Sequence, residues 1–321
     1  MCNSRNKMYR KNQTMIDYFI LLGFSGAPVL QHVLFAVFFL IYLTTIMGNI
    51  SIVFAYRLTP SLHTPMYFFL ANLSFLEICY ISATVPKMLS NFLSAHKTIP
   101  FSGCAIQMYC FILLGGAECY LLSMMAYDRY NAICHPLLYG TIMNKRVCIQ
   151  LVAFSWIGGA INSLINTVLT FSLSFCGNNR INHFFCDIPP IMQLACTATK
   201  INEMVLLVAC GCVIVSSFIL TLTSYTHIIT TILKIKSTSG RKKAFSTCTS
   251  HLIVVTLSYG SAIFMYFRPK STYSMEQDKV ISALYAFIPP MLNPFIYSLR
   301  NGDVKAAVKR IVCHTVMGLK Y

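Results

Sequence analysis

An Asp-Arg pair is the strongest chemical feature of this sequence. Asp128 and Arg129 lie in the run MAYDRYNAICHPL, at the end of a long apolar stretch. A carboxylate can hold a neighbouring guanidinium in one rotamer through a charge-assisted hydrogen bond, and its release frees a long cation to reach another partner. The pair is therefore a candidate conformational switch. The competing interpretation is an anchor whose arginine extends its head to the lipid phosphates.

Two carboxylates, Glu77 and Glu118, lie inside apolar runs. An ionised side chain within a bilayer is costly, so such residues usually face the interior of a helix bundle and have a function. The alternative is that one or both are protonated and hydrogen-bonded.

Cysteines suggest a second kind of chemistry. Four of the fourteen lie at the start of an apolar run and in one long loop, which indicates extracellular disulfides: Cys104, Cys176, Cys186 and Cys196. Spacing alone allows three pairings. The segment HFFCD, His183 to Asp187, also has metal-ligand residue types, but a disulfide-bonded Cys186 could not coordinate as a thiolate, so a structural loop is favoured.

No enzyme is predicted. The sequence contains no Ser-His-Asp, metal-ligand or phosphate-loop pattern, and His227 and His251 are single residues expected near the cytoplasmic face.

The elements that must position these groups are membrane spans. Of the 321 residues, 56% are hydrophobic and 11% are charged, against roughly 25% charged in ordinary soluble domains. A helix crosses a bilayer in about 20 apolar residues, and backbone groups in lipid must be satisfied within the segment. The predicted spans are Val29–Tyr56, Met66–Val85, Ala105–Ala126, Val147–Leu169, Met204–Ile232, Ala244–Phe267 and Val280–Leu299. We therefore expect an all-α, integral membrane seven-transmembrane helix bundle over residues 29–299, with no separate soluble domain.

Basic residues set the expected orientation. The loop KIKSTSGRKK (Lys234–Lys243) and the tail after Leu299 are the most basic segments and should both be cytoplasmic. The N-terminal segment 1–28 should then be extracellular, and Asn12 begins a glycosylation sequon. Residues 300–321 should form a cytoplasmic tail with a short amphipathic helix on the membrane surface.

The net charge of +16 does not indicate a nucleic-acid partner, because the basic residues lie in short loops between apolar runs. No cleavable signal peptide is evident, so the first span is expected to act as the insertion signal.

Five motifs, in order, resemble those of the vertebrate olfactory receptors within the rhodopsin-like G-protein-coupled receptors. They are LHTPMYFFLANLSFLEICY (Leu62–Tyr80), MAYDRYNAICHPL (Met125–Leu137), Ser224-Tyr225, KAFSTCTSHL (Lys243–Leu252) and PMLNPFIYSLRN (Pro290–Asn301). The resemblance runs from about Phe19 to Arg310. Two departures are Asn131, where the family usually has valine, and the doublet Pro289-Pro290; Asn131 puts the strength of coupling in question.

The resemblance implies roles for several residues. It implies the disulfides Cys104–Cys186 and Cys176–Cys196. It also implies a sodium ion as one interpretation of Glu77 and Glu118, near Asn49 and the seventh-span Asn293. The residues implied as a G-protein switch are Asp128, Arg129, Tyr130, Tyr225, Asn293, Pro294 and Tyr297.

The expected ligand site lies between spans three, five, six and seven, toward the outside. Helical spacing selects Met108, Phe111, Ile112 and Gly115 on the third span, Leu206, Ala209, Cys210 and Val213 on the fifth, and Tyr259, Ala262, Ile263 and Tyr266 on the sixth. Such a lining suits small, neutral, hydrophobic ligands, although each residue could equally belong to the packing core. Phe111 stands where similar amine receptors carry Asp, which argues against a biogenic amine.

The resemblance implies an odorant receptor that binds a volatile and activates a stimulatory, olfactory-type G protein to raise cyclic AMP. It implies a multi-pass plasma-membrane protein, in the ciliary membrane of olfactory neurons. One alternative is a chemosensor of the same fold for an internal metabolite in a non-olfactory tissue. Another is a transporter or channel, which would need internal repeats or charged pore residues beyond Glu77 and Glu118.

Overall fold

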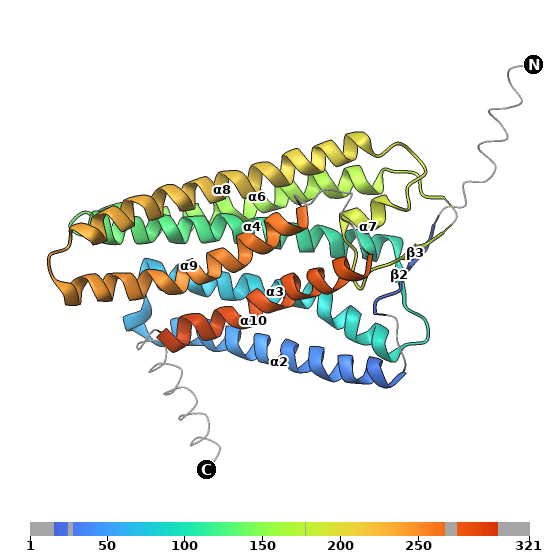
Figure 1. Ribbon diagram of the computed structural model, residues 1–321, viewed down its shortest axis with the longest axis horizontal. Helices are drawn as coiled ribbons and strands as arrows, with labels where there is room; N and C mark the ends of the chain where they lie inside the picture. Colours follow the sequence, from blue (N-terminus) through green and yellow to red (C-terminus); the bar gives the residue numbers. More distant parts are fainter. Residues whose placement is uncertain (1–15, 25–27, 177, 267–274, 301–321) are drawn as a thin grey trace, which may run out of the picture.

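Seven long helices make up most of the part of the chain that the structure describes (Figure 1). The computed structural model describes residues 16–24, 28–176, 178–266 and 275–300. Within them the long helices are α2 (Pro28–Leu58), α3 (Pro65–Leu93), α4 (Phe101–Cys134), α6 (Lys145–Phe171), α8 (Lys200–Lys234), α9 (Thr238–Tyr266) and α10 (Met275–Arg300). All seven are long and apolar enough to cross a membrane. The predicted seven-transmembrane helix bundle is confirmed.

Each helix overlaps one predicted span and extends beyond it. The difference is large in α3, where the prediction ended at Val85 and the helix continues through Pro86 to Leu93, and in α4, which runs past Ala126 to Cys134. Hydropathy marks only the apolar part of a helix, whereas polar end turns keep their backbone hydrogen bonds. A proline inside a span is tolerated because neighbouring groups can satisfy the freed carbonyl.

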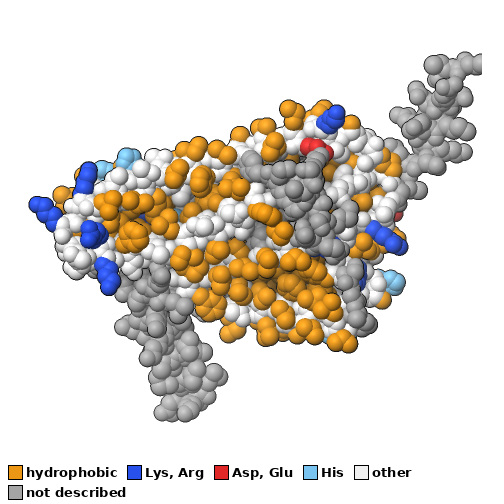
Figure 2. All heavy atoms as spheres, viewed as in Figure 1, with side chains coloured by type: hydrophobic (Ala, Val, Ile, Leu, Met, Phe, Trp, Pro, Cys, Tyr) orange, Lys and Arg blue, Asp and Glu red, His pale blue; other side chains and the backbone are white. Residues whose placement is uncertain are grey.

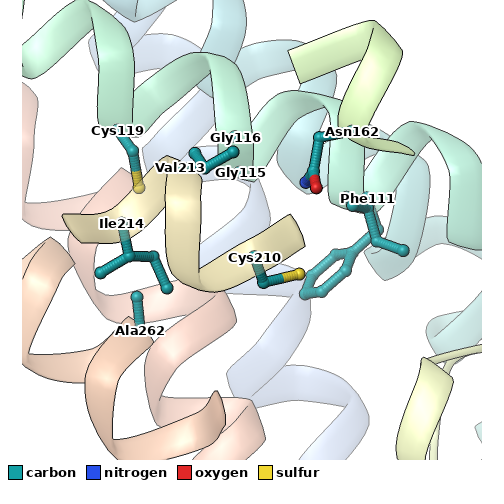
Figure 3. A pocket seen from close by; sticks show the side chains of 10 residues that line it. Phe111, Gly115, Gly116, Cys119, Asn162, Cys210, Val213, Ile214 and Ala262 are labelled. Carbon is teal, nitrogen blue, oxygen red and sulfur yellow. The ribbon is translucent and has the colours of Figure 1, made fainter. Parts of the chain in front are cut away.

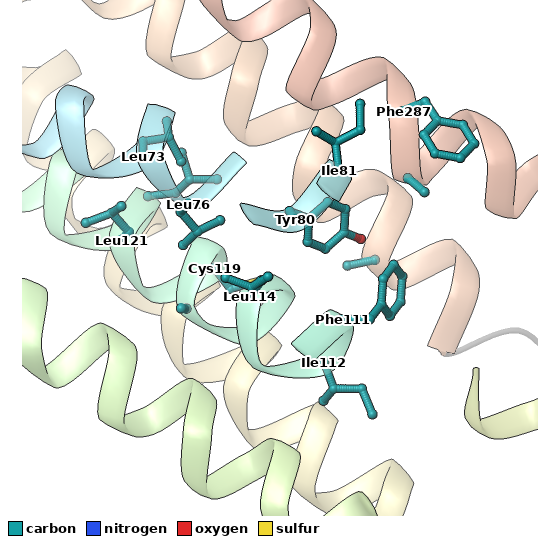
Figure 4. Packing of buried hydrophobic residues seen from close by; sticks show 14 of the residues in the cluster. Leu73, Leu76, Tyr80, Ile81, Phe111, Ile112, Leu114, Cys119, Leu121 and Phe287 are labelled. Carbon is teal, nitrogen blue, oxygen red and sulfur yellow. The ribbon is translucent and has the colours of Figure 1, made fainter. Parts of the chain in front are cut away.

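Helix α4 lies at the centre and packs against α3, α6, α8 and α9. Its closest approach is to α6, where a Cβ added to Gly159 would lie 2.4 Å from the carbonyl oxygen of Leu113. Small residues allow such backbone contact between membrane helices. On its other side, α4 contributes Phe111, Leu114 and Leu121 to a core shared with α3 (Figure 4).

A small sheet at one end of the bundle was not predicted. Its strands are β1 (Tyr18–Leu21), β2 (Thr98–Pro100) and β3 (Arg180–Ile181), in the order β2-β1-β3. β1 is antiparallel to β2 and parallel to β3. The sheet joins the N-terminal segment to the connection before α4 and to the long loop after α6. We call this end of the bundle the sheet end.

The sheet is held down by aromatic packing. Phe19 and Leu21 alternate with more exposed residues and are fully buried. The ring of Phe19 lies 5.8 Å from the rings of both Phe101 and Phe175. The period of two in side-chain direction explains why one face of this short strand is apolar.

The remaining elements are short: η1 (Pro60–Leu62), α5 (Tyr139–Ile142) and α7 (Ile188–Met192). Apolar side chains cover much of the outer surface of the bundle (Figure 2), as expected for contact with lipid. Residues 1–15 and 301–321 lie outside the described residues. The glycosylation of Asn12, the amphipathic tail helix and the sides on which the termini lie therefore stay predictions.

Candidate functional site

A small cavity lies within the bundle (Figure 3). Its volume is about 30 Å³. It is lined from α4, α6, α8 and α9 by Phe111, Ile112, Gly115, Gly116, Cys119, Asn162, Cys210, Val213, Ile214 and Ala262. Most of its lining residues on α4 belong to the half of that helix nearer to the sheet end. The lining is apolar apart from one amide and two thiols, and glycines leave the α4 wall open.

The structure brings together about half of the predicted pocket. Phe111, Ile112, Gly115, Cys210, Val213 and Ala262 all line the cavity, as the helical spacing predicted. Met108, Leu206, Ala209 and Tyr259 do not line it. Ile263 is 42% exposed on the outside of α9, so the prediction that it faces the pocket was wrong. The side chain of Tyr266 lies outside the described residues.

Asn162 on α6 is the lining residue that the sequence analysis missed. It is buried, and its side-chain oxygen accepts a hydrogen bond from the amide of Asn166 at 3.2 Å. The expected site was bounded by spans three, five, six and seven. In the structure, α6, which is the fourth span, closes the cavity on one side. Two asparagines spaced by four in an apolar run were the available signal, because they share one helix face.

Directly beside the cavity, polar bonds join α9 to α4. The hydroxyl of Tyr259 donates to the carbonyl oxygen of Cys119 at 2.8 Å. The hydroxyl of Ser258 donates to a carboxylate oxygen of Glu118 at 2.9 Å. Ala262 lies one helical turn beyond these residues on α9 and lines the cavity, so both bonds lie next to the cavity wall.

The sheet-end wall of the cavity is tied to the long loop. Phe111 packs against Phe185, with ring centroids 4.6 Å apart, and against Tyr80 at 5.0 Å. The neighbouring Cys186 is bonded to Cys104, and its backbone N–H donates to Gln107 at 2.9 Å. The loop therefore positions Phe111 directly.

Both disulfides have the pairing that the resemblance implied, Cys104–Cys186 and Cys176–Cys196. The HFFCD segment, which contains the disulfide-bonded Cys186, packs as a buried loop. His183 stacks on Phe184, its Nδ1 accepts the N–H of Phe185 at 3.4 Å, and burial lowers its pKa to about 3. Asp187 caps α7 by accepting the N–H of Ile188 at 2.8 Å.

A second polar cluster lies deeper, between α2, α3 and α10. Asn293 donates a hydrogen bond to Glu77, and Asn49 donates to the carbonyl oxygen of Pro290 at 3.2 Å. Three buried side-chain oxygens, Glu77 Oε2, Asn49 Oδ1 and Asn293 Oδ1, have no hydrogen-bond partner within the part of the chain that the structure describes. Oxygen donors of this kind suit a hard cation. The residues present fit the sodium ion that the resemblance implied, whereas Glu118 is bonded to Ser258.

The Asp-Arg pair at the other end of α4 is arranged differently from the prediction. The buried Asp128 accepts a hydrogen bond from Tyr139 on α5 at 2.8 Å, and Arg129 donates instead to the sulfur of Met66. Successive residues on a helix do not face each other, which explains the separate partners. Burial and the adjacent carboxylate raise the pKa of the Tyr139 hydroxyl.

Near Arg129, a buried histidine links three helices. The hydroxyl of Tyr225 on α8 bonds to Nδ1 of His251 on α9 at 2.8 Å. The other ring nitrogen of His251 lies 3.1 Å from the carbonyl oxygen of Leu122 on α4. Tyr225 was predicted among the switch residues, whereas His251 was predicted to be a single residue without a functional partner. Of the other predicted switch residues, Tyr130 bonds His135 at 3.0 Å, and the buried hydroxyl of Tyr297 has no hydrogen-bond partner among the described residues.

Comparison with known proteins identifies the family. The sequence profile described as olfactory receptor matches residues 38–315. Olfactory receptor 5AP2 of Mus musculus is 50% identical over 317 residues, which cover 99% of this chain and 100% of that relative. Olfactory receptor 9G4 of Homo sapiens is 51% identical over 299 residues, or 93% of this chain and 91% of the relative. The prediction that the chain is not an enzyme is confirmed. This chain belongs to the olfactory receptor family, and it is a multi-pass plasma-membrane G-protein-coupled receptor for odorants.

Proposed function

We propose that this receptor binds a small, mostly hydrophobic volatile in the cavity between α4, α6, α8 and α9. The observation that carries the proposal is the lining itself, in which apolar side chains surround a single amide, Asn162. Apolar walls with few polar groups are typical of sites for small molecules. The amide gives one hydrogen-bonding group, which favours alcohols, aldehydes or ketones over bare hydrocarbons.

The size of the cavity supports a ligand-driven conformational change. A volume of about 30 Å³ is far below the roughly 300–1,000 Å³ of typical ligand sites. An odorant must therefore displace the lining, and Ala262 on α9 transmits that displacement to the Tyr259 and Ser258 bonds with α4. A ligand shifts the equilibrium between two conformations only if it binds one of them more tightly. Here the odorant would bind the conformation with an expanded cavity and α9 moved outward more tightly than the conformation with the compact cavity.

At the opposite end, outward movement of α9 would break the bond between Tyr225 and His251. Tyr225 and Arg129 would then be free to rearrange, and a stimulatory, olfactory-type G protein would dock there and raise cyclic AMP. The location that follows is the ciliary membrane of olfactory neurons.

Sodium belongs to the same proposal. Glu77, Asn49 and Asn293 would hold the ion with their free oxygens, and its positive charge would stabilise the ionised carboxylate. The thermal stability of the purified receptor should rise when sodium replaces choline as the cation. Glu77→Gln should remove that dependence. A sodium effect that persists in the variant would contradict this assignment.

The decisive experiment is a cyclic-AMP reporter assay in transfected cells against a panel of volatiles. Arg129→Ala and untransfected cells are the negative controls, and surface labelling confirms equal expression. Responses to volatiles that disappear in the variant would support the proposal. Responses confined to involatile metabolites would favour a chemosensor for an internal metabolite, and ion currents without any cyclic-AMP response would favour a channel.

A further inference from the structure

A groove lies where α8 ends and α9 begins, at the end of the bundle opposite the sheet. Its volume is about 690 Å³, and its lining includes Leu233, Thr238, Arg241, Lys242 and Phe245. None of these residues takes part in the odorant cavity or in the Tyr225–His251 contact. Their chemistry therefore needs a separate explanation.

One half of the groove is apolar and open. Leu233 is 67% exposed and Phe245 is 54% exposed. On the same helix as Leu233, Leu222 and Ile229 are also exposed and belong to the apolar outer surface of the bundle. Large exposed apolar patches mark contact with a partner or a membrane. Leu233 and Phe245 thus continue the lipid-facing surface up to the end of the helices.

The other half of the groove is strongly basic. Arg241 and Lys242 line it and are exposed, and Lys234 and Lys236 lie in the last turn of α8 and the short connection that follows. No Asp or Glu occurs between residues 204 and 275, so no carboxylate of this segment neutralises these charges. Figure 2 shows Lys and Arg side chains gathered at this end of the molecule. A cationic rim beside an apolar wall complements an anionic headgroup attached to hydrocarbon chains.

We propose that this groove binds an acidic membrane phospholipid with a polyphosphorylated headgroup, its phosphates on Arg241 and Lys242 and its acyl chains against Leu233 and Phe245. Basic residues beside a membrane span attract anionic lipids of the cytoplasmic leaflet. Several clustered cations favour a headgroup with several negative charges over one with a single charge. A soluble anion would leave the apolar half uncovered.

Lipid binding to the purified full-length receptor in detergent tests the proposal. The probe is phosphatidylinositol bisphosphate, with phosphatidylcholine as competitor, and bound lipid is counted by native mass spectrometry. Arg241→Gln combined with Lys242→Gln should weaken binding about 30-fold, from the contribution of each cation near a membrane surface. The matched control is Lys145→Gln with Arg146→Gln, an equal loss of exposed charge at the start of α6. It should leave binding unchanged.

A second pair of variants separates a lipid site from an anion site. Leu233→Ser with Phe245→Ser should weaken binding of the phospholipid about tenfold or more, because acyl-chain burial is lost. It should not change the weak binding of soluble inositol trisphosphate. Arg241→Lys with Lys242→Arg keeps the charges and should bind lipid like the unmodified receptor, which guards against a misfolded variant.

Three results would overturn the proposal. One is equal loss of binding in the control and the groove variant. Another is equal affinity for the phospholipid and for inositol trisphosphate, which would identify a site for soluble phosphates. The third is normal lipid binding by Arg241→Gln with Lys242→Gln together with lost cyclic-AMP output, which would assign the groove to the G protein.

Discussion

Filling the cavity at Ala262 should exclude large agonists and spare small ones. The Ala262 side chain is buried and lines a cavity of about 30 Å³, which is room for about two water molecules. The phenyl ring introduced by Ala262→Phe cannot fit there without displacing its neighbours or the ligand. Overpacking typically costs about 1–3 kcal/mol, so the potency of bulky agonists should fall roughly 5- to 150-fold.

The adjacent Ile263 gives a matched control. Ile263→Phe adds a ring to the same helix, but on its lipid-facing side, so agonist potency should not change. Dose–response curves for a homologous series of aldehydes, measured with a cyclic-AMP reporter at equal surface expression, should separate progressively with chain length only in the Ala262 variant. Superimposable curves for both variants across the series would refute the placement of the ligand beside Ala262.

Four further outcomes are expected. Cys104→Ser should abolish surface expression, because loss of a native disulfide costs about 2–5 kcal/mol; normal flow-cytometry levels would contradict this. Arg129→Ala should reach the cell surface but lose cyclic-AMP output. Full signalling by this variant would show that Arg129 acts only as a membrane anchor. Asn12→Gln should remove a glycosidase-sensitive mobility shift, and an unshifted unmodified receptor would count against an external N-terminus. Burial raises the pKa of Asp187 from 3.8 to about 6. Between these two pH values the folded receptor holds a proton on Asp187 that the unfolded chain has lost. The free energy of unfolding should therefore fall by up to about 3 kcal/mol as the pH rises from 3.8 to about 6. Asp187→Asn should remove this fall in stability. The measurement is the difference in unfolding temperature between the variant and the unmodified receptor at each pH. A difference is needed because the lowered pKa of His183 changes the stability in the opposite direction, and it does so equally in both proteins.

The bundle was predictable because the bilayer imposes a simple rule on each span. About 20 apolar residues are needed to cross it. Each span could be recognised by its hydropathy even where it contained a proline or a buried carboxylate. What hydropathy could not locate was the end of each helix. Helix α3 runs to Leu93 and α9 begins at Thr238, in polar turns that leave the hydrocarbon but keep their backbone bonds.

The sheet shows a different limit of sequence reasoning. Its strands have two to four residues and come from three distant segments of the chain. No periodic pattern can be recognised over so few positions. Phe19 and Leu21 become informative only once Phe101 and Phe175 are known to lie beside them.

The candidate site was half predicted for a related reason. Helical spacing selects a face of one helix but cannot say how neighbouring helices are rotated. Ile263 was grouped with Ala262 on spacing, yet only Ala262 faces inward. Asn162 was missed because the prediction assigned no part of the pocket to the fourth span.

The polar contacts of α9 explain how a small ligand could control a distant surface. This helix bonds to α4 through Tyr259 and Ser258 beside the cavity, and through His251 nearer the opposite end. Buried hydrogen bonds in a low dielectric medium are costly to leave unmade, so intermediate positions of α9 are disfavoured. Under the proposed mechanism, an odorant that breaks the bonds near Ala262 would also change the contact of His251 with Tyr225. Coupling between the two ends would then follow from the rigidity of one helix, with no continuous chain of side chains between them.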